Sequence, residues 1–197
     1  MKKIMIIIIA GAMTLFAGCA TVAPTTETYT SYRIYSTPNS YTLTEVRNAL
    51  VNTAKEFNNN AVVMNNIPPH PLPETPGRFT IKHMNMGPVS MQFPQMPDAT
   101  VSVSSTKSPS SSESMHWVAG IYPYKGGYSV QFVMVATYQR GATNIFDPVA
   151  LGAALGREAA YSQEGGVEGR IKAWFDDFAN KITKKVPMEL EEAYPQS

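Results

Sequence analysis

The pattern that most constrains this fold is a strong β alternation over residues 116–138. Two runs rich in aromatic and β-branched residues, His116–Tyr124 and Tyr128–Tyr138, are separated by Lys125-Gly126-Gly127. Such runs around a short glycine-containing turn are typical of a β-hairpin. In the second run both alternating sets of side chains include apolar residues. We therefore expect this strand near the centre of a sheet.

Three segments are predicted as helices. The first, over residues 43–58, is preceded by a capping box in which the Thr42 hydroxyl and the Glu45 carboxylate serve exposed backbone N–H groups. A second helix is expected over 148–161, because Asp147-Pro148 is a cap followed by proline at the first helical position. The third, over 167–184, carries one apolar stripe with helical spacing. That stripe comprises Val167, Ile171, Trp174, Phe175, Phe178 and Ile182.

The rest of the chain is divided between short strands and irregular segments. Strands are expected over 28–36, 61–64, 78–83 and 99–104. The proline-rich segment 68–76, the methionine-rich segment 84–98 and the serine-rich segment 105–114 are expected to be extended or irregular. This order predicts an α+β fold with a mostly antiparallel sheet and about three helices packed on one face.

The first residues have the composition of a secretory signal. Lys2 and Lys3 precede the apolar run Ile4–Phe16, which is shorter than the ~20 residues that span a bilayer. The residues Leu15–Cys19 resemble the lipobox of bacterial lipoproteins, although Phe16 stands where Leu is usual.

The lipobox resemblance implies a membrane anchor. In that family the signal is cleaved before the cysteine, here Cys19, whose thiol is acylated with fatty chains such as palmitate. Cys19 is the only cysteine, so it has no disulfide partner within the chain. Two or more acyl chains anchor a protein stably. Ala20 after it implies delivery to the outer membrane rather than the inner membrane of the cell envelope, facing either the periplasm or the cell surface.

These assignments divide the chain into four parts. Residues 1–18 are the lipoprotein signal peptide, 19–27 a lipidated tether, 28–186 a single α+β domain and 187–197 a polar tail. Cleavage removes two of the 16 Lys and Arg residues, leaving 14 against 15 Asp and Glu. A nearly neutral protein without a basic patch is not expected to bind nucleic acid.

Motifs for catalysis are scarce. The chain has three histidines, no Gly-x-Ser-x-Gly elbow, no phosphate-binding loop and no cysteine pair for zinc. The sequence therefore favours a non-enzymatic protein over an enzyme acting, for example, on peptidoglycan. The leading hypothesis is a lipid-anchored accessory or scaffolding module that binds an envelope protein or a cell-wall partner.

A methionine-rich segment supports an alternative function. His83, Met84, Met86, Met91 and Met96 place four thioethers and an imidazole within fourteen residues. These soft ligands select Cu(I) or Ag(I), so the alternative is a periplasmic Cu(I)- or Ag(I)-binding lipoprotein. The same methionines would also serve as adaptable packing or contact residues. No other cofactor is expected.

Tyrosines supply a second candidate surface. Tyr122, Tyr124 and Tyr128 lie on the predicted hairpin around its turn. A sheet face rich in tyrosine can bind a glycan or peptide through ring stacking and hydroxyl groups. Ordinary β propensity also explains tyrosine at these positions.

Overall fold

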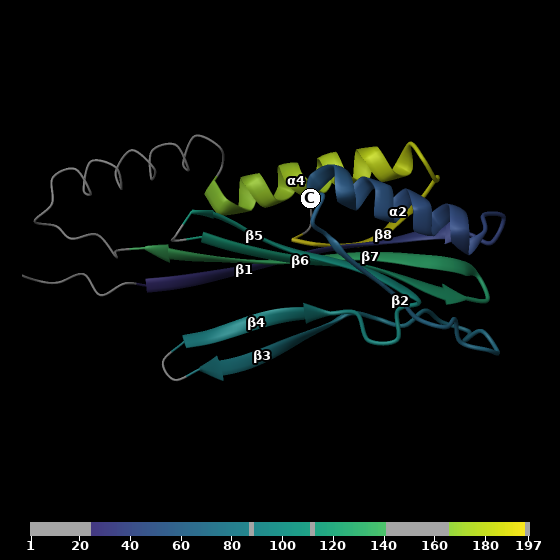
Figure 1. Cartoon of the computed structure of the whole chain (residues 1–197), viewed down its shortest axis with the longest axis horizontal. Coiled ribbons are helices and arrows are strands. Elements are labelled where there is room, and N and C mark those ends of the chain that lie inside the picture. Colours follow the sequence, from purple (N-terminus) through teal and green to yellow (C-terminus); the bar gives the residue numbers. More distant parts are fainter. Residues whose placement is uncertain (1–24, 87–88, 111–112, 141–165, 196–197) are drawn as a thin grey trace, which may run out of the picture.

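The computed structural model describes residues 25–86, 89–110, 113–140 and 166–195. These residues form an α+β fold with a six-stranded antiparallel sheet in the order β2-β5-β6-β7-β1-β8 and a separate two-stranded sheet of β3 and β4 (Figure 1). The strands are β1 (Thr25–Pro38), β2 (Val62–Asn65), β3 (Thr80–Met86), β4 (Val89–Gln95), β5 (Val101–Ser110), β6 (Glu113–Tyr124), β7 (Gly127–Arg140) and β8 (Glu189–Tyr194). The helices are α2 (Leu43–Phe57) and α4 (Gly166–Thr183).

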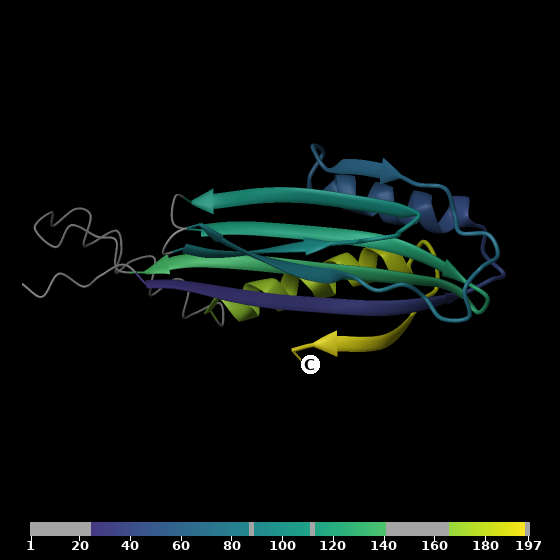
Figure 2. The same cartoon turned by 90° about the horizontal axis from the view of Figure 1, so that it is seen from below.

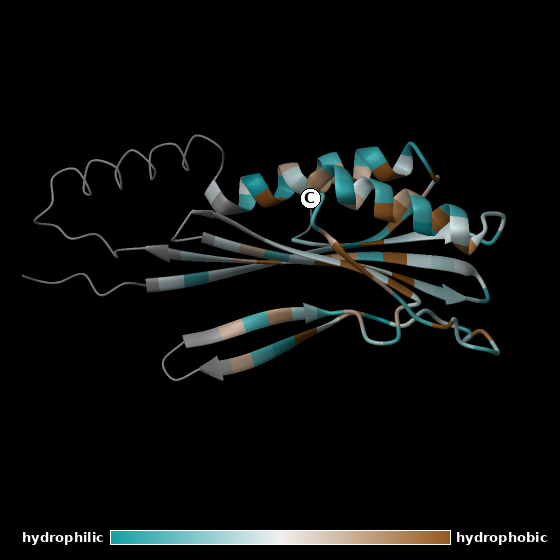
Figure 3. Cartoon of the chain, in the orientation of Figure 1, coloured by the Kyte–Doolittle hydropathy of each residue, from teal (hydrophilic) through white to brown (hydrophobic). Residues whose placement is uncertain are grey.

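The described elements form three layers. Both helices cover one face of the six-stranded sheet, and the β3–β4 hairpin lies on the opposite face (Figure 1). We call the latter the hairpin face. Seen from below, β2 and β8 lie at opposite edges of the sheet (Figure 2). The helices show alternating hydrophobic and hydrophilic bands, as amphipathic helices do (Figure 3).

The central position expected for residues 128–138 is confirmed. This segment lies within β7, which pairs with β6 on one side and with β1 on the other. Phe132 is buried towards the helices, where its ring contacts Phe178 of α4 at a centroid distance of 4.6 Å. Gln131 is buried towards the hairpin face, where it bonds to Phe79. Layers on both faces explain why both sides of this strand are buried.

The helix layer forms as its periodicity predicts. The capping box of Thr42 and Glu45 starts α2, with the backbone N–H of Thr42 2.7 Å from Glu45 Oε2. α4 ends near the predicted position, and four residues of its stripe, Ile171, Phe175, Phe178 and Ile182, are buried in the core. An aromatic cluster joins the two helices and β6, since the ring of Trp174 lies 5.1 Å from Phe57 and 5.5 Å from Trp117.

Several segments differ from the sequence-based prediction. The methionine-rich segment, expected to be irregular, contains most of the β3–β4 hairpin, in which Met84 lies opposite Met91. β5 and β6 also extend into the serine-rich segment 105–114, where Ser105 is opposite Trp117. In both places, pairing with a neighbouring strand satisfies the backbone where the side-chain pattern alone is weak.

The segment 187–197, expected to be a polar tail, contains β8. Residues Glu189–Tyr194 pair with β1 at the edge of the sheet. Its glutamates are compatible with a strand because an edge strand has a solvent-exposed side.

The described residues contain two helices, so the expected number of about three is not matched. The segment 148–161, predicted as another helix, lies outside the described residues, as do the predicted signal peptide and Cys19.

Candidate binding site on the hairpin face

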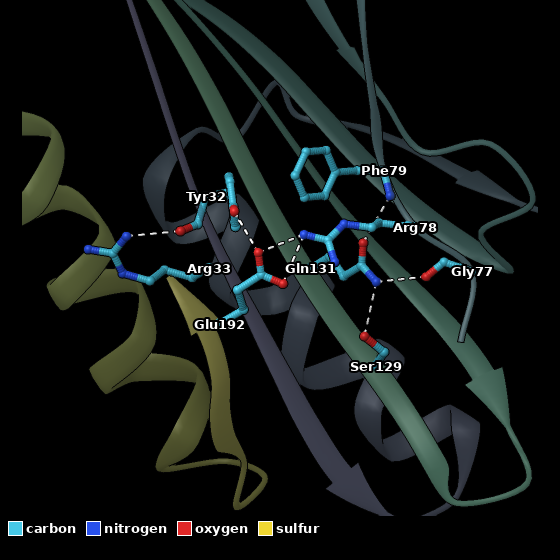
Figure 4. A network of polar contacts seen from close by, with 8 residues as sticks. All are labelled: Tyr32, Arg33, Gly77, Arg78, Phe79, Ser129, Gln131 and Glu192. Carbon is cyan, nitrogen blue, oxygen red and sulfur yellow. Dashed lines mark hydrogen bonds and ion pairs between the residues drawn. The ribbon is translucent and has the colours of Figure 1, made fainter. Parts of the chain in front are cut away.

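A buried amide fixes the start of the hairpin layer. Gln131 of β7 is only 2% exposed. Its Nε2 donates to the carbonyl oxygen of Gly77 at 2.8 Å and to Ser129 Oγ at 3.0 Å, and its Oε1 accepts from the Phe79 backbone N–H at 3.0 Å (Figure 4). The segment leading into β3 is therefore bonded on both sides of Arg78 to the centre of the sheet.

Gly77 allows this segment to approach closely. A Cβ atom at position 77 would lie 2.6 Å from Cδ1 of Tyr122, a distance that real Cβ atoms do not reach. Tyr122 itself is 2% exposed, and burial raises the pKa of its phenol. The ring thus packs directly against the main chain of residue 77.

A polar clasp joins this segment to β8. Arg78 Nη2 lies 2.7 and 2.8 Å from the two oxygens of Glu192, and the Tyr32 hydroxyl donates to Glu192 Oε1 at 2.6 Å (Figure 4). Arg78 lowers the pKa of the Glu192 carboxyl, while the hydrogen bond to Glu192 raises the pKa of Tyr32. The three side chains bond to one another, so the clasp is a structural contact. It lies at the exposed surface of the protein.

Beside the hairpin lies a groove of about 330 Å³. Its walls come from β2, β5 and β6 of the large sheet and from the end of β4 with the segment that follows it. The lining residues are Met64, Pro94, Gln95, Met96, Pro97, Ser102, Ser104, His116 and Val118. We call this space the hairpin-face groove. Two thioethers, an imidazole and two hydroxyls in an otherwise uncharged lining give it the character of a small binding site.

The imidazole of the groove is held in place. His116 Nδ1 lies 2.8 Å from Thr106 Oγ1 on the neighbouring strand β5. The ring of Phe93 lies edge-on at a centroid distance of 6.3 Å. Burial lowers the pKa of His116, because desolvation disfavours the imidazolium.

One thioether of the groove is also held in place. Met96 Sδ accepts a weak hydrogen bond from the Tyr122 hydroxyl at 3.5 Å. It lies above Gly120, where a Cβ atom would be 3.0 Å from the sulfur. Glycine at position 120 thus leaves room for the methionine on the hairpin face.

The rim of the groove continues to the edge of the sheet. β2 is an edge strand, and its Val62 and Met64 are 59% and 56% exposed. Ile67, just after the strand, is 92% exposed. Exposed apolar residues at an unpaired edge are unusual, because edge strands are commonly protected by charges. The opposite edge, β8, has that protection from Glu189, Glu191 and Glu192.

A second hollow, of about 490 Å³, lies near the β6–β7 turn. It is lined by Ser36, Thr37, Pro38, Tyr124, Gly126, Pro187, Met188 and Glu189. Two of its three hydroxyls are already engaged, since Thr37 Oγ1 donates to the Pro187 carbonyl at 2.9 Å and Ser36 Oγ to Glu191 at 2.5 Å. These two side chains therefore hold the β8 segment against β1.

The predicted metal ligands are separated by the hairpin. Met84 and Met91 are opposite each other and are 53% and 39% exposed. His83 is opposite Gln92, which bonds to Thr30 of β1, so His83 lies on the other side of the hairpin from the two methionines. Met96 lies in the groove, and the side chain of Met86 lies outside the described residues.

The three predicted tyrosines do not form one surface. Tyr122 is buried under Gly77, and Tyr124 lines the second hollow. Tyr128 packs against the core on the helix side. Alternation along the strands sends Tyr122 and Tyr128 to opposite faces of the sheet.

Sequence reasoning offered no ground for selecting Met64. It lies 32 positions before Met96 and reaches the groove only because β2 pairs with β5. The short apolar run Val62–Met64 was the available signal. A run of this length indicates a strand but does not show which of its side chains face solvent.

In comparisons with models of protein families, with curated proteins and with solved structures, the chain has no match. Among the described residues there is no cluster of three or more His, Cys, Asp or Glu side chains that could hold a metal ion. No helix in the described part of the chain is long and apolar enough to cross a membrane.

Proposed function

We propose that this protein is a lipid-anchored, non-enzymatic module of the cell envelope that binds a partner protein along the edge strand β2. The observation that carries this proposal is the exposed edge of β2, whose own four residues are uncharged. Val62 and Met64 keep 59% and 56% of their surface in solvent, while the other edge of the same sheet carries three glutamates. An unprotected edge next to a groove is suited to strand addition.

The backbone of β2 has groups available for a further strand. The Asn66 N–H donates to the Thr100 carbonyl of the adjoining segment at 2.7 Å. In antiparallel pairs, residues that bond to the neighbour alternate with residues whose N–H and C=O point outwards. Continuing this alternation along the register of β2 and β5 directs the backbone groups of Val63 and Asn65 away from the sheet.

The chemistry of the edge defines the partner. Val62 and Met64 share the face that borders the groove, and no charged side chain occurs among the four residues of β2. A matching partner offers an extended, uncharged segment with apolar residues at alternate positions. Backbone hydrogen bonds would supply affinity, and contacts with Val62, Met64 and the groove would supply specificity.

The proposed lipid anchor and the non-enzymatic role rest on the sequence. The lipobox-like residues Leu15–Cys19 support acylation at Cys19, and Ala20 supports an outer-membrane location. The lack of recognised catalytic motifs in the sequence supports a binding role over an enzymatic one.

Crosslinking in cells tests the edge. A photoreactive amino acid at Val62 is expected to give a discrete adduct with an envelope protein. Asn65→Pro is expected to abolish the adduct, because proline removes an outward N–H that a partner strand would use. Asn65→Ala is the matched control: it keeps the N–H and loses only the exposed bond from Arg47.

Two results would contradict this proposal. One is an adduct of equal intensity in the Asn65→Pro and Asn65→Ala proteins while both remain folded by circular dichroism. The other is an adduct that forms with the photoreactive residue on β8, at Leu190, and not with the one at Val62.

A further inference from the structure

We propose that the hairpin-face groove binds an uncharged, extended peptide segment of about four residues, whose backbone is hydrogen-bonded by the hydroxyls of Ser102 and Ser104. The peptide would lie along β5, between the edge strand β2 and the end of β4. This inference goes beyond the proposed function, because it concerns the face of the sheet and holds whether or not a strand adds to the edge of β2.

A buried hydroxyl on the floor of the groove points to a ligand. Ser102 of β5 lines the groove and is only 3% exposed. Among the residues that the structure describes, its hydroxyl has no hydrogen-bond partner. Polar groups buried to this extent are nearly always bonded, because leaving one unpaired costs free energy. A backbone N–H or C=O of a bound peptide would satisfy Ser102, since a hydroxyl both donates and accepts.

The register of the sheet determines the length of the groove. Ser102, Ser104 and Thr106 alternate along the same face of β5, and His116 of β6 lies opposite Thr106. Four residues of a strand extend about 13 Å, so Ser102 and His116 lie at opposite ends of the groove. Hydrogen-bonding groups placed in a line of this length suit an extended ligand and not a compact one.

The spacing of the hydroxyls matches the backbone of a peptide. Alternate residues of a strand are about 6.7 Å apart, and so are the backbone groups that point to one side of an extended peptide. Ser102 and Ser104 can therefore bond to alternate residues of a segment that runs along β5. At the far end, Thr106 Oγ1 lies 2.8 Å from Nδ1 of His116, which leaves Nε2 of this ring for the end of the peptide.

The lining of the groove defines the side chains of the peptide. None of the nine described lining residues is Asp, Glu, Lys or Arg, so a charged side chain would lose its hydration without gaining a partner. Met64, Pro94 and Met96 form apolar walls, and methionine adapts to side chains of different shape. None of the same nine residues is Phe, Tyr or Trp, the rings on which a sugar would stack. The lining therefore favours a peptide over a glycan.

Selection from a phage-displayed library of random peptides tests the site. The full chain carrying Cys19→Ser, which removes its only thiol, is kept in detergent and immobilised for the selection. We expect the enriched sequences to share an uncharged stretch of about four residues. The enriched sequence is then synthesised with a fluorescent label, and its affinity is measured by anisotropy.

Hydroxyl deletion locates the contacts of the labelled peptide. Ser102→Ala with Ser104→Ala is expected to weaken binding by about fivefold or more, because two hydrogen bonds are lost. Neither hydroxyl has a partner among the described residues, so this double variant should fold normally, which circular dichroism checks. Ser40→Ala with Thr44→Ala removes two exposed hydroxyls outside the groove and should leave the affinity unchanged.

A second readout separates the groove from the rest of the surface. With methyl-labelled methionine, the peptide is expected to shift the NMR signals of Met64 and Met96. The signals of Met84 and Met91, on the outer side of the hairpin, should not change. Asn65→Pro, which would block strand addition at β2, should leave the affinity for the peptide unchanged, so this variant distinguishes the groove from the proposed function.

Four results would each overturn the proposal. The library could yield no binding sequence, or the enriched peptide could bind the double serine variant and the original protein equally. Binding could be lost in the Asn65→Pro protein alone, which would assign the peptide to the edge of β2. Finally, a trisaccharide of N-acetylglucosamine, and not the peptide, could shift the signals of Met64 and Met96, which would make the groove a glycan site.

Discussion

At the scale of single residues, the hairpin layer depends on a few polar contacts at its first residues. Gln131 uses three of its four hydrogen-bonding positions to hold Gly77, Phe79 and Ser129. A buried amide of this kind is stabilising only while its partners are present, because an unpaired buried polar group costs about 1–3 kcal/mol. The position of the groove thus depends on a side chain that does not line it.

Gln131→Ala is expected to lower the free energy of unfolding by about 2–4 kcal/mol. The change leaves the Phe79 N–H and the Gly77 carbonyl without their partner and creates a cavity under the hairpin. Urea denaturation followed by tryptophan fluorescence measures this loss. Gln95→Ala, at an exposed position on β4, is the control and should stay within about 0.5 kcal/mol of the original protein. Equal stability of both variants would contradict this account of the hairpin.

At the scale of elements, helix α2 owes its start to a local motif. The Thr42 and Glu45 side chains satisfy each other's backbone N–H groups, and this hydrogen bonding lowers the pKa of the Glu45 carboxyl. Such a motif is readable from sequence because it lies within four consecutive residues. The two edges of the sheet cannot be read from sequence in this way, because the exposure of β2 and the pairing of β8 depend on distant strands.

Thr42→Ala is expected to destabilise the protein by about 1 kcal/mol, because it removes the side-chain cap of α2. Thr44→Ala is the matched control, as Thr44 is exposed in the first turn of the same helix and takes no part in the cap. Thermal unfolding of the two variants side by side measures the difference. A Thr44→Ala protein as unstable as Thr42→Ala would show that helix propensity, and not the cap, is responsible.

At the scale of the whole molecule, one sheet supports two different layers. The apolar core lies between the helices and the large sheet and includes the cluster of Trp117, Trp174 and Phe178. The hairpin layer is held by Gln131 and by the clasp of Arg78, Glu192 and Tyr32, and it leaves the groove and the β2 edge uncovered. The sheet therefore has its apolar core on the helix side and a candidate binding surface on the hairpin face.

The proposed lipid anchor concerns the whole protein and is tested at this scale. Cys19→Ser is expected to abolish labelling by a clickable palmitate analogue and to leave the chain with an uncleaved signal, visible as a higher apparent mass. The reason is that acylation of the Cys19 thiol would be the chemical step that precedes cleavage. Ala20→Ser, which keeps the cysteine, is the control. Equal labelling of the Cys19→Ser protein would contradict lipidation at this position.

Local patterns in the sequence are sufficient to predict the two described helices, the capping box, the central strand β7 and the α+β class. Each of these depends on residues within one turn of helix or one strand, where periodicity directly reflects which side is buried. The motifs searched for catalysis, the signal-like composition of residues 1–18 and the lipobox-like residues Leu15–Cys19 are likewise matters of short stretches, and they remain predictions.

Tertiary structure alone determines the hairpin of β3 and β4, the strand β8 and the composition of the groove. Strand pairing brings Met64 and His116 to one space although they are 52 positions apart, and the same pairing puts His83 and Met84 on opposite sides of a hairpin. Hydrogen bonds between distant strands decide these neighbours, and no local pattern records them. The sequence therefore identifies the types of residue available for binding, while the register of the sheet determines which of them meet.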